Sequence, residues 1–176
     1  LVGHSLGGSV AMEIVNKFPD IVTSASLVNP VGFAKEVNRN FLEIFLTATK
    51  RKEMKEALTK LFYSSETLSR TMVENSLRHN RIEGVISQLQ LIADKNFPDY
   101  KQATDWLPLL SSSSTPFQII WGVHDEIIQY DTKVFPDNVP LIEIENAGHM
   151  VHMEQPTEFN QILKGYLNSQ EISECL

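Results

Sequence analysis

Apolar and polar positions alternate along the first 32 residues with two different periods. Between Leu6 and Phe18 the apolar residues recur every three to four positions, which predicts a helix that Pro19 ends. The stretch Ile21 to Asn29 is rich in small and β-branched residues and stops at Pro30, which predicts a buried strand followed by a loop. Because the chain begins within an apolar stretch, the expected order is strand, helix, strand.

A different pattern fills residues 33–105. Amphipathic stripes with charged opposite faces predict consecutive helices, which cover Val37 to Phe45, Met54 to Phe62, Leu68 to Leu77 and Arg81 to Ala93. Four of the apolar residues have two interpretations, the lining of a substrate pocket or ordinary core, and the helical spacing favours core; they are Phe41, Phe45, Met54 and Met72. This block of helices interrupts an otherwise alternating pattern.

Residues 106–176 return to the alternation. The elements expected there are a loop at Ser111 to Thr115, a buried strand at Phe117 to Gly122, a short helix at Lys133 to Asn138, a half-exposed strand at Leu141 to Glu145 and an amphipathic helix after Pro156. Strands that alternate with helices predict a parallel sheet and an α/β fold. The predicted division is core 1–32, helical block 33–105 and core 106–176.

The stretch Gly3-His4-Ser5-Leu6-Gly7-Gly8 lies between the first strand and the first helix. It has the pattern of a nucleophile elbow, in which serine occupies a strained turn and glycines two places before and after it prevent clashes. Gly3 and Gly7 hold those places, and the backbone N–H of Leu6 would face an oxyanion beside Ser5. A Walker phosphate loop is excluded because Ser9 follows Gly8 where that pattern needs lysine. A plain glycine-rich turn is the remaining alternative.

Two further polar residues follow predicted strands, at the sheet edge where active sites of parallel sheets lie. Asp125 comes after the strand that ends at Gly122, and His149 comes after the strand that begins at Leu141. The order Ser5, Asp125, His149 is that of a nucleophile, acid and base triad. Glu126 is a competing acid, which we rank below Asp125.

Each member also has a plainer interpretation. Asp125 would cap a turn, and His149 would be a surface histidine in a loop. Two other histidines are close in sequence to the predicted triad, His4 inside the elbow and His152 after His149. For both of these, an ordinary packing or solvent role is favoured over a role in support of the triad.

Composition excludes several classes of partner. Fifteen basic and 22 acidic residues give a net charge of −7 without long runs, so neither nucleic acid nor an anionic membrane is expected as a partner. No apolar run reaches the length of a membrane span. No metal is expected, since the one histidine cluster, at 149–154, lacks helical ligand spacing, and no dinucleotide fingerprint is present. The single cysteine, Cys175, cannot form an internal disulfide, which fits a cytoplasmic protein.

With these motifs the whole chain resembles the α/β-hydrolase superfamily, with the predicted triad on its triad and the helical block on its cap. Three longer strings are similar to the hydrolase-like domain behind a lipoyl domain in the dihydrolipoamide acetyltransferase component of acetoin dehydrogenase complexes; they are Asn29-Pro30-Val31-Gly32-Phe33, Asn80-Arg81-Ile82-Glu83-Gly84 and Gly148-His149-Met150-Val151-His152-Met153-Glu154. The resemblance implies a small acyl substrate on a lipoyl group, coenzyme A as acceptor, a lipoyl domain or multienzyme complex as partner, and no cofactor bound by this domain itself.

The resemblance also implies that the first strands of the fold and a second oxyanion donor fall before Leu1. Residues 1–176 on their own could therefore be either active or inert, and the resemblance leaves both alternatives open. We also expect the strand Ile21 to Asn29 to have a bare edge. The chain is then expected to associate as a homodimer through this edge, or through the apolar surface that the first half of the fold would cover.

Two classes of function follow from these observations. The first is serine acyl transfer or hydrolysis on an ester or thioester, with a carboxylesterase of other specificity as a variant. The second is a binding or scaffold module in which the triad is vestigial.

Overall fold

Four parallel strands form one sheet in the part of the chain that the computed structural model describes, residues 1–173. Cys175, for which no internal disulfide is expected, lies outside these residues. The elements in chain order are β1 (Val2–His4), α1 (Leu6–Lys17), η1 (Pro19–Ile21), β2 (Ala25–Val28), α2 (Arg39–Thr47), α3 (Arg51–Thr59), α4 (Arg70–Asn80), α5 (Val85–Asn96), η2 (Pro98–Tyr100), α6 (Leu107–Ser112), β3 (Phe117–Gly122), η3 (Thr132–Val134), β4 (Leu141–Ile144), α7 (Val151–Glu154) and α8 (Pro156–Ser173).

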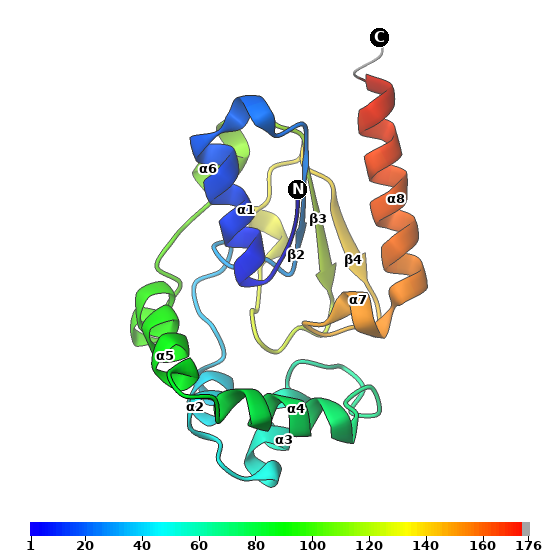
Figure 1. Ribbon diagram of the computed structural model, residues 1–176. Helices are drawn as coiled ribbons and strands as arrows, with labels where there is room; N and C mark the ends of the chain where they lie inside the picture. Colours follow the sequence, from blue (N-terminus) through cyan, green and yellow to red (C-terminus); the bar gives the residue numbers. More distant parts are fainter. Residues whose placement is uncertain (174–176) are drawn as a thin grey trace.

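The sheet has the order β1-β2-β3-β4 and is covered by helices on both faces (Figure 1). On one face, α1 and α6 pack against the largest apolar cluster, which includes Met12, Leu27, Leu110 and Trp121. On the other face, α7 and α8 contribute Val151 and Phe159 to a second cluster. All six residues of β3 are buried, as expected for an inner strand of a parallel sheet. The predicted α/β class with a parallel sheet is therefore confirmed.

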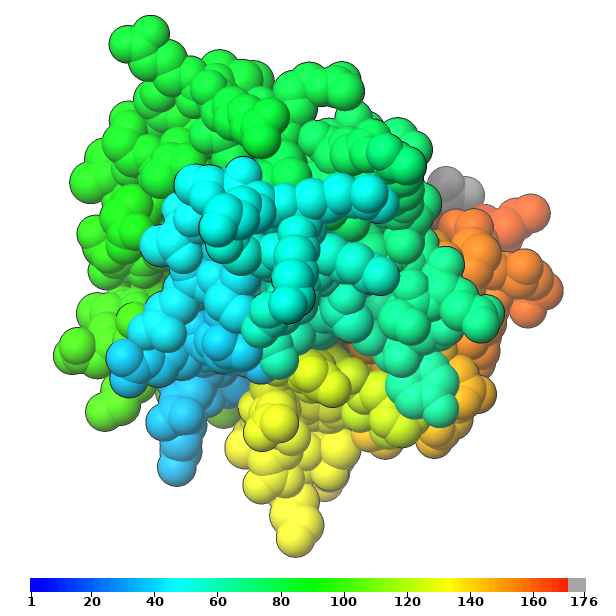
Figure 2. All heavy atoms as spheres, turned by 90° about the horizontal axis from the view of Figure 1, so that it is seen from below, coloured from blue at the N-terminus to red at the C-terminus, as the bar shows by residue number. Residues whose placement is uncertain are grey.

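Helices α2 to α5 gather beyond the carboxyl ends of the strands, and Figure 2 shows them from that side. Their shared interior forms an apolar cluster of its own around Met54, on which Phe45 and Met72 pack, while Phe41 packs against the main core. Met54 is fully buried. The interpretation as ordinary core is confirmed for Met54, while Phe41, Phe45 and Met72 are partly buried where they pack against these clusters. No helix among the described residues is long and apolar enough to cross a membrane.

The prediction of a bare edge on the second strand is wrong. Strand β1 pairs with β2 over three residues, from Val2 opposite Ser26 to His4 opposite Val28, and Ser26 N–H donates to the Leu1 carbonyl at 2.9 Å. Strand β2 is also shorter than predicted because Pro19–Ile21 forms a 3₁₀ turn. Since β2 lies between β1 and β3, the outer strand among the described residues is β1. A homodimer stays a prediction without this edge as its basis.

Two other local predictions are wrong. Ser111 and Ser112, expected in a loop, end helix α6, and their hydroxyls donate to the carbonyls of Leu107 and Pro108 at 2.8 and 2.9 Å. The short helix expected at residues 133–138 is only the 3₁₀ turn η3, which ends at Val134. Proline explains both differences, because it favours the first turn of a helix, as in α6, and cannot continue one, as at position 136.

Candidate active site

Three polar side chains from three strand ends meet at the carboxyl edge of the sheet. Ser5 follows β1 directly, and the loops after β3 and β4 carry Asp125 and His149. His149 Nε2 lies 2.8 Å from Ser5 Oγ, and His149 Nδ1 lies 2.8 Å from Asp125 Oδ2. The structure thus brings together the three residues that the sequence singled out, in a chain of two hydrogen bonds.

Of the two plainer interpretations, the one for His149 is wrong and the one for Asp125 is correct in part. His149 is 3% exposed, so it is not a surface histidine. Asp125 does cap a turn, since its Oδ1 accepts the backbone N–H groups of Ile127 and Ile128 at 2.7 and 3.1 Å. Its other oxygen, Oδ2, is the one that faces His149. Asp125 therefore serves both arrangements at once.

Glu126, the competing acid, does not reach His149. It is exposed, and the contact it makes is through its backbone carbonyl, which accepts the side-chain amide of Asn38 at 2.8 Å. The preference for Asp125 over Glu126 agrees with this geometry.

Ser5 occupies a strained turn at the start of α1. Its backbone has φ 54° and ψ −122°, a conformation in the left-handed half of the Ramachandran plot that costs on the order of 1–3 kcal/mol for a residue with a side chain. Strand β2 and the loop after it hold the turn in place, because Ser5 N–H donates to the Val28 carbonyl at 2.9 Å and the Ser5 carbonyl accepts Val31 N–H at 3.0 Å. Leu6 is the first residue of α1, so its N–H has no partner within the helix and is available to an anion beside Ser5.

The glycines of the elbow differ in what they permit. A Cβ on Gly3 would lie 2.4 Å from the Gly7 carbonyl oxygen, and one on Gly8 would lie 2.6 Å from the Pro30 Cβ. A Cβ on Gly7 meets nothing within 4 Å in the described part of the chain. The expected steric requirement at Gly7 is therefore wrong, because the tight approach falls on Gly8, where α1 crosses the loop after β2.

Gly3→Ala is expected to destabilise the fold by about 2–3 kcal/mol, because its methyl group would meet backbone atoms that cannot move aside without opening the elbow. The matched control is Gly7→Ala, which adds the same methyl group to open space inside a helix and is expected to be neutral or slightly stabilising. Chemical denaturation of both variants measures the difference. Equal losses of unfolding free energy would contradict this steric assignment.

Asn29 is a site residue that the sequence analysis did not weigh. It follows β2, has φ 42° and is fully buried. Its amide Nδ2 donates to Asp125 Oδ2 at 2.8 Å, and Trp121 Nε1 donates to the same oxygen at 3.2 Å. The available signal was a polar residue at the carboxyl end of a buried strand, which is the rule that found Asp125.

These donors decide the charge of Asp125. Burial acts to raise its pKa, but the hydrogen bonds from His149, Asn29 and the Ile128 N–H outweigh burial and lower the pKa below its usual value. Asp125 is therefore a carboxylate at neutral pH.

Two neighbouring histidines pack beside His149. His4 Nε2 donates to the His149 carbonyl at 2.8 Å, with the ring centroids of the two residues 4.9 Å apart. The ring of His152 lies 4.8 Å from that of His4. Burial first, and the nearby His149 second, lower the pKa of His4 to about 4. His4 is thus a neutral donor that holds the backbone of His149.

Acidification is expected to weaken the fold through His4. Its pKa is about 4 in the folded chain and 6.5 as a free side chain, so between these values the unfolded chain binds the extra proton. This contribution to stability is complete above pH 6.5 and falls by about 2 kcal/mol at pH 5. Chemical denaturation at pH 7 and pH 5 measures the unfolding free energy that is lost on acidification. This loss should be smaller in His4→Gln than in wild type, because Gln does not titrate but keeps a donor to the His149 carbonyl. Equal losses would contradict the prediction.

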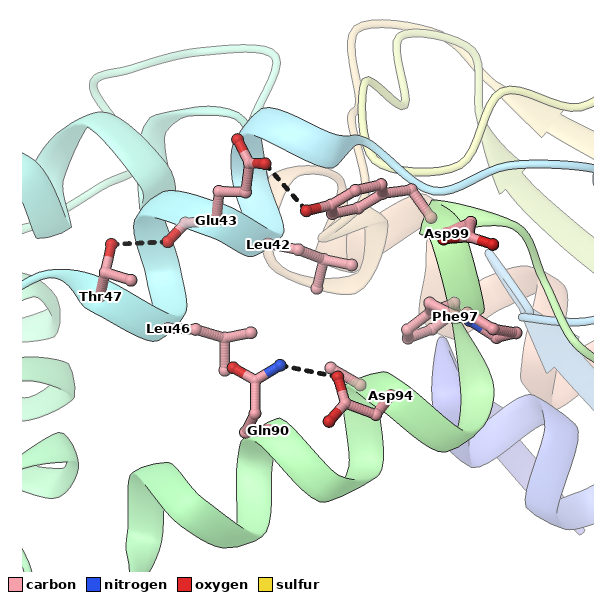
Figure 3. A pocket seen from close by; sticks show the side chains of 11 residues that line it. Leu42, Glu43, Leu46, Thr47, Gln90, Asp94, Phe97 and Asp99 are labelled. Atoms are coloured by element: carbon pink, nitrogen blue, oxygen red, sulfur yellow. Dashed lines mark hydrogen bonds between the residues drawn. The ribbon is translucent and has the colours of Figure 1, made fainter.

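The cavity shown in Figure 3 lies among the cap helices rather than at Ser5. It has a volume of about 640 Å³ between α2 and the α5–η2 segment, with an apolar floor that includes Leu42, Leu46 and Phe97. The Tyr100 hydroxyl donates to Glu43 Oε1 at 2.8 Å. None of the three triad positions is among its lining residues in the described chain. We therefore do not assign this cavity a role in substrate binding.

Metal chemistry has no evident site in residues 1–173, where no group of three or more His, Cys, Asp and Glu side chains could hold an ion. This finding concerns the grouping of side chains only. That no metal takes part stays a prediction.

Several known proteins are similar to the chain in sequence or in fold. The family model described as the alpha/beta hydrolase family matches residues 1–162. The chain is 34% identical, over 95% of its length, to the dihydrolipoyllysine-residue acetyltransferase component of the acetoin cleaving system from Cupriavidus necator, and covers 45% of that protein. It is 28% identical, over 96% of its length, to monoacylglycerol lipase ABHD6 from Bos taurus, and covers 54% of that protein. The chain thus spans about half the length of these curated relatives.

Among solved structures, a meta-cleavage product hydrolase from Pseudomonas fluorescens IP01 has a similar fold, with a TM-score of 0.78. The two share 16% identity, over 96% of this chain and 64% of the other. Likeness at this identity concerns the fold alone.

Proposed function

The chain belongs to the alpha/beta hydrolase family, and from that premise we propose that it performs serine acyl transfer on an ester or thioester. The observation that carries the proposal is the pair of 2.8 Å hydrogen bonds that joins Ser5, His149 and Asp125 in that order. A hydroxyl, an imidazole and a buried carboxylate in this order have the geometry that nucleophilic acyl transfer requires.

The proposed reaction begins at Ser5. His149 Nε2 accepts the hydroxyl proton as Oγ attacks the acyl carbon, and the oxyanion that forms is stabilised by the Leu6 N–H at the start of α1. The Asp125 carboxylate accepts Nδ1–H, which fixes the tautomer of the imidazole and stabilises its cationic form. When the acyl–oxygen or acyl–sulfur bond breaks, the proton passes from His149 to the leaving group. Water or a thiol then gives its proton to His149 and attacks the acyl carbon of acyl-Ser5. The bond between that carbon and Oγ breaks, His149 returns the proton to Oγ, and the acid or the new thioester leaves.

The relationship to an acetyltransferase component supports a narrower proposal. The acyl group would come from a dihydrolipoyl thioester on a partner lipoyl domain or complex, with coenzyme A as acceptor. Both groups are substrates in this proposal, and neither is a bound cofactor of the domain. The likeness to a monoacylglycerol lipase favours a second candidate, a carboxylesterase with water as acceptor.

The two candidates differ in substrate and acceptor, so one kinetic series separates them. The full-length protein would be given short acyl thioesters, including S-acetyl-dihydrolipoamide, and matched p-nitrophenyl esters, each with and without coenzyme A. The narrower proposal expects thioester turnover that coenzyme A accelerates and that His149→Ala abolishes. Ester hydrolysis indifferent to coenzyme A would favour the carboxylesterase. No turnover of either substrate would favour the scaffold with a vestigial triad.

A further inference from the structure

One short segment of the cap is in contact with both loops that carry the acid and the base. Residues 61–64, here named the cap segment, follow α3. The Leu61 carbonyl accepts Met150 N–H at 3.1 Å, next to His149. The Tyr63 ring stacks on the ring of His124, next to Asp125, with centroids 4.2 Å apart. The cap segment therefore touches the triad loops on both sides.

Gly148, the residue before His149, lies against the backbone of this segment. A Cβ on Gly148 would be 2.9 Å from the Tyr63 nitrogen and 3.0 Å from the Leu61 carbonyl oxygen, so only glycine fits against the backbone of the cap segment. The cap segment and the histidine loop cannot move past one another without the loss of this contact.

Glu154 bridges the two sides with one carboxylate. Its Oε2 accepts Gly148 N–H at 2.6 Å, and its Oε1 accepts Ser64 N–H at 3.0 Å. The side chain is half-buried at the end of α7. Hydrogen bonds from backbone N–H groups to a carboxylate are charge-assisted and about twice as strong as neutral ones. One side chain thus fixes the peptide before His149 to the peptide of the cap segment.

We propose that Glu154 is a positioning residue that couples the cap to His149. The Gly148 peptide precedes His149 and fixes the position of its backbone, so a displacement of the cap segment would shift His149 relative to Ser5. Acyl transfer is sensitive to displacements of about 1 Å. The coupling makes the reactivity of Ser5 depend on the position of the cap. This inference rests on the proposed function, since it takes Ser5 as the nucleophile.

The side-chain chemistry at position 154 separates coupling from packing. Glu154→Gln keeps the size of the side chain but replaces one acceptor oxygen with an NH₂ group that would face an N–H donor. If Glu154 only fills space, this variant is harmless. If it couples the two segments, Gln is nearly as damaging as Ala, and Glu154→Asp, which keeps the carboxylate, restores part of the function. Glu158→Gln is the matched control, because it removes the same charge from an exposed position in the first turn of α8.

The experiment uses the full-length protein and two readouts. Hydrogen exchange of peptides that cover residues 61–66 and 145–150 should be roughly tenfold faster in Glu154→Gln than in wild type and unchanged in Glu158→Gln. The rate at which a fluorophosphonate probe labels Ser5 should fall by about tenfold in Glu154→Gln, with the loss of ester turnover in kcat rather than KM. The exchange and labelling rates of Glu154→Asp should lie between those of wild type and Glu154→Gln.

Each outcome decides the proposal. Faster exchange in both peptides with slower labelling supports the coupling, and partial rescue by Glu154→Asp excludes a general loss of folding. Unchanged exchange, or faster exchange in the cap peptide with normal labelling, overturns it. If the wild-type protein is never labelled, the proposed function fails, while the exchange rates still decide whether Glu154 joins the two segments.

Discussion

Ser5→Ala is expected to lower acyl turnover by the full-length protein by roughly 10⁴-fold or more, since the nucleophile of an acyl-enzyme mechanism is removed. The substitution deletes one oxygen that faces His149 and leaves the elbow otherwise intact, so the unfolding free energy should change little. The measurement is kcat/KM with the best substrate of the ester and thioester series. Ser87→Ala, on the exposed side of α5, is the control. A loss of less than tenfold in Ser5→Ala would contradict the account.

Asp125→Asn is expected to lower turnover by roughly 10³- to 10⁴-fold, because an amide does not hold the Nδ1–H tautomer of His149 or stabilise its cation. Asp125 also accepts four other N–H donors, from Asn29, Trp121, Ile127 and Ile128. An NH₂ group in place of one oxygen would face some of these buried donors, which should cost about 1–3 kcal/mol of stability. Turnover and chemical denaturation measure the two effects separately.

The control for Asp125→Asn is Glu126→Gln, which removes the same charge one residue further along, at an exposed position. It should leave both turnover and stability close to wild type. Comparable losses in the two variants would show that the loop, rather than the carboxylate of Asp125, is what matters.

Much of the triad could be predicted from sequence, because each member has a local signal. Ser5 lies in a glycine-rich turn between a strand and a helix, and Asp125 and His149 each follow a predicted strand. A parallel sheet brings such strand ends to one edge. The signal for Asn29 was of the same kind, but an Asn before Pro is also common in turns. The sequence alone therefore did not distinguish a site residue from a turn residue at this position.

Other features depend on contacts between distant segments, and no local pattern encodes them. Gly8 rather than Gly7 is crowded because α1 crosses Pro30, which depends on the path of the loop after β2. Ser64 and Gly148 share the carboxylate of Glu154 only because the cap folds back over the histidine loop. The pairing of β1 with β2 rests on three residues, too short a run for periodicity to reveal.

The most direct test of an acyl-transfer site at Ser5 is to find which residue of the full-length protein reacts with a fluorophosphonate probe. Such probes form a covalent bond with a serine whose hydroxyl is activated by a neighbouring base. We expect mass spectrometry of the digested protein to find the label on the peptide that contains Ser5, and we expect His149→Ala to abolish this label. A protein that stays unlabelled, or a label at another serine that survives His149→Ala, would contradict the claim that Ser5, His149 and Asp125 form a working acyl-transfer site.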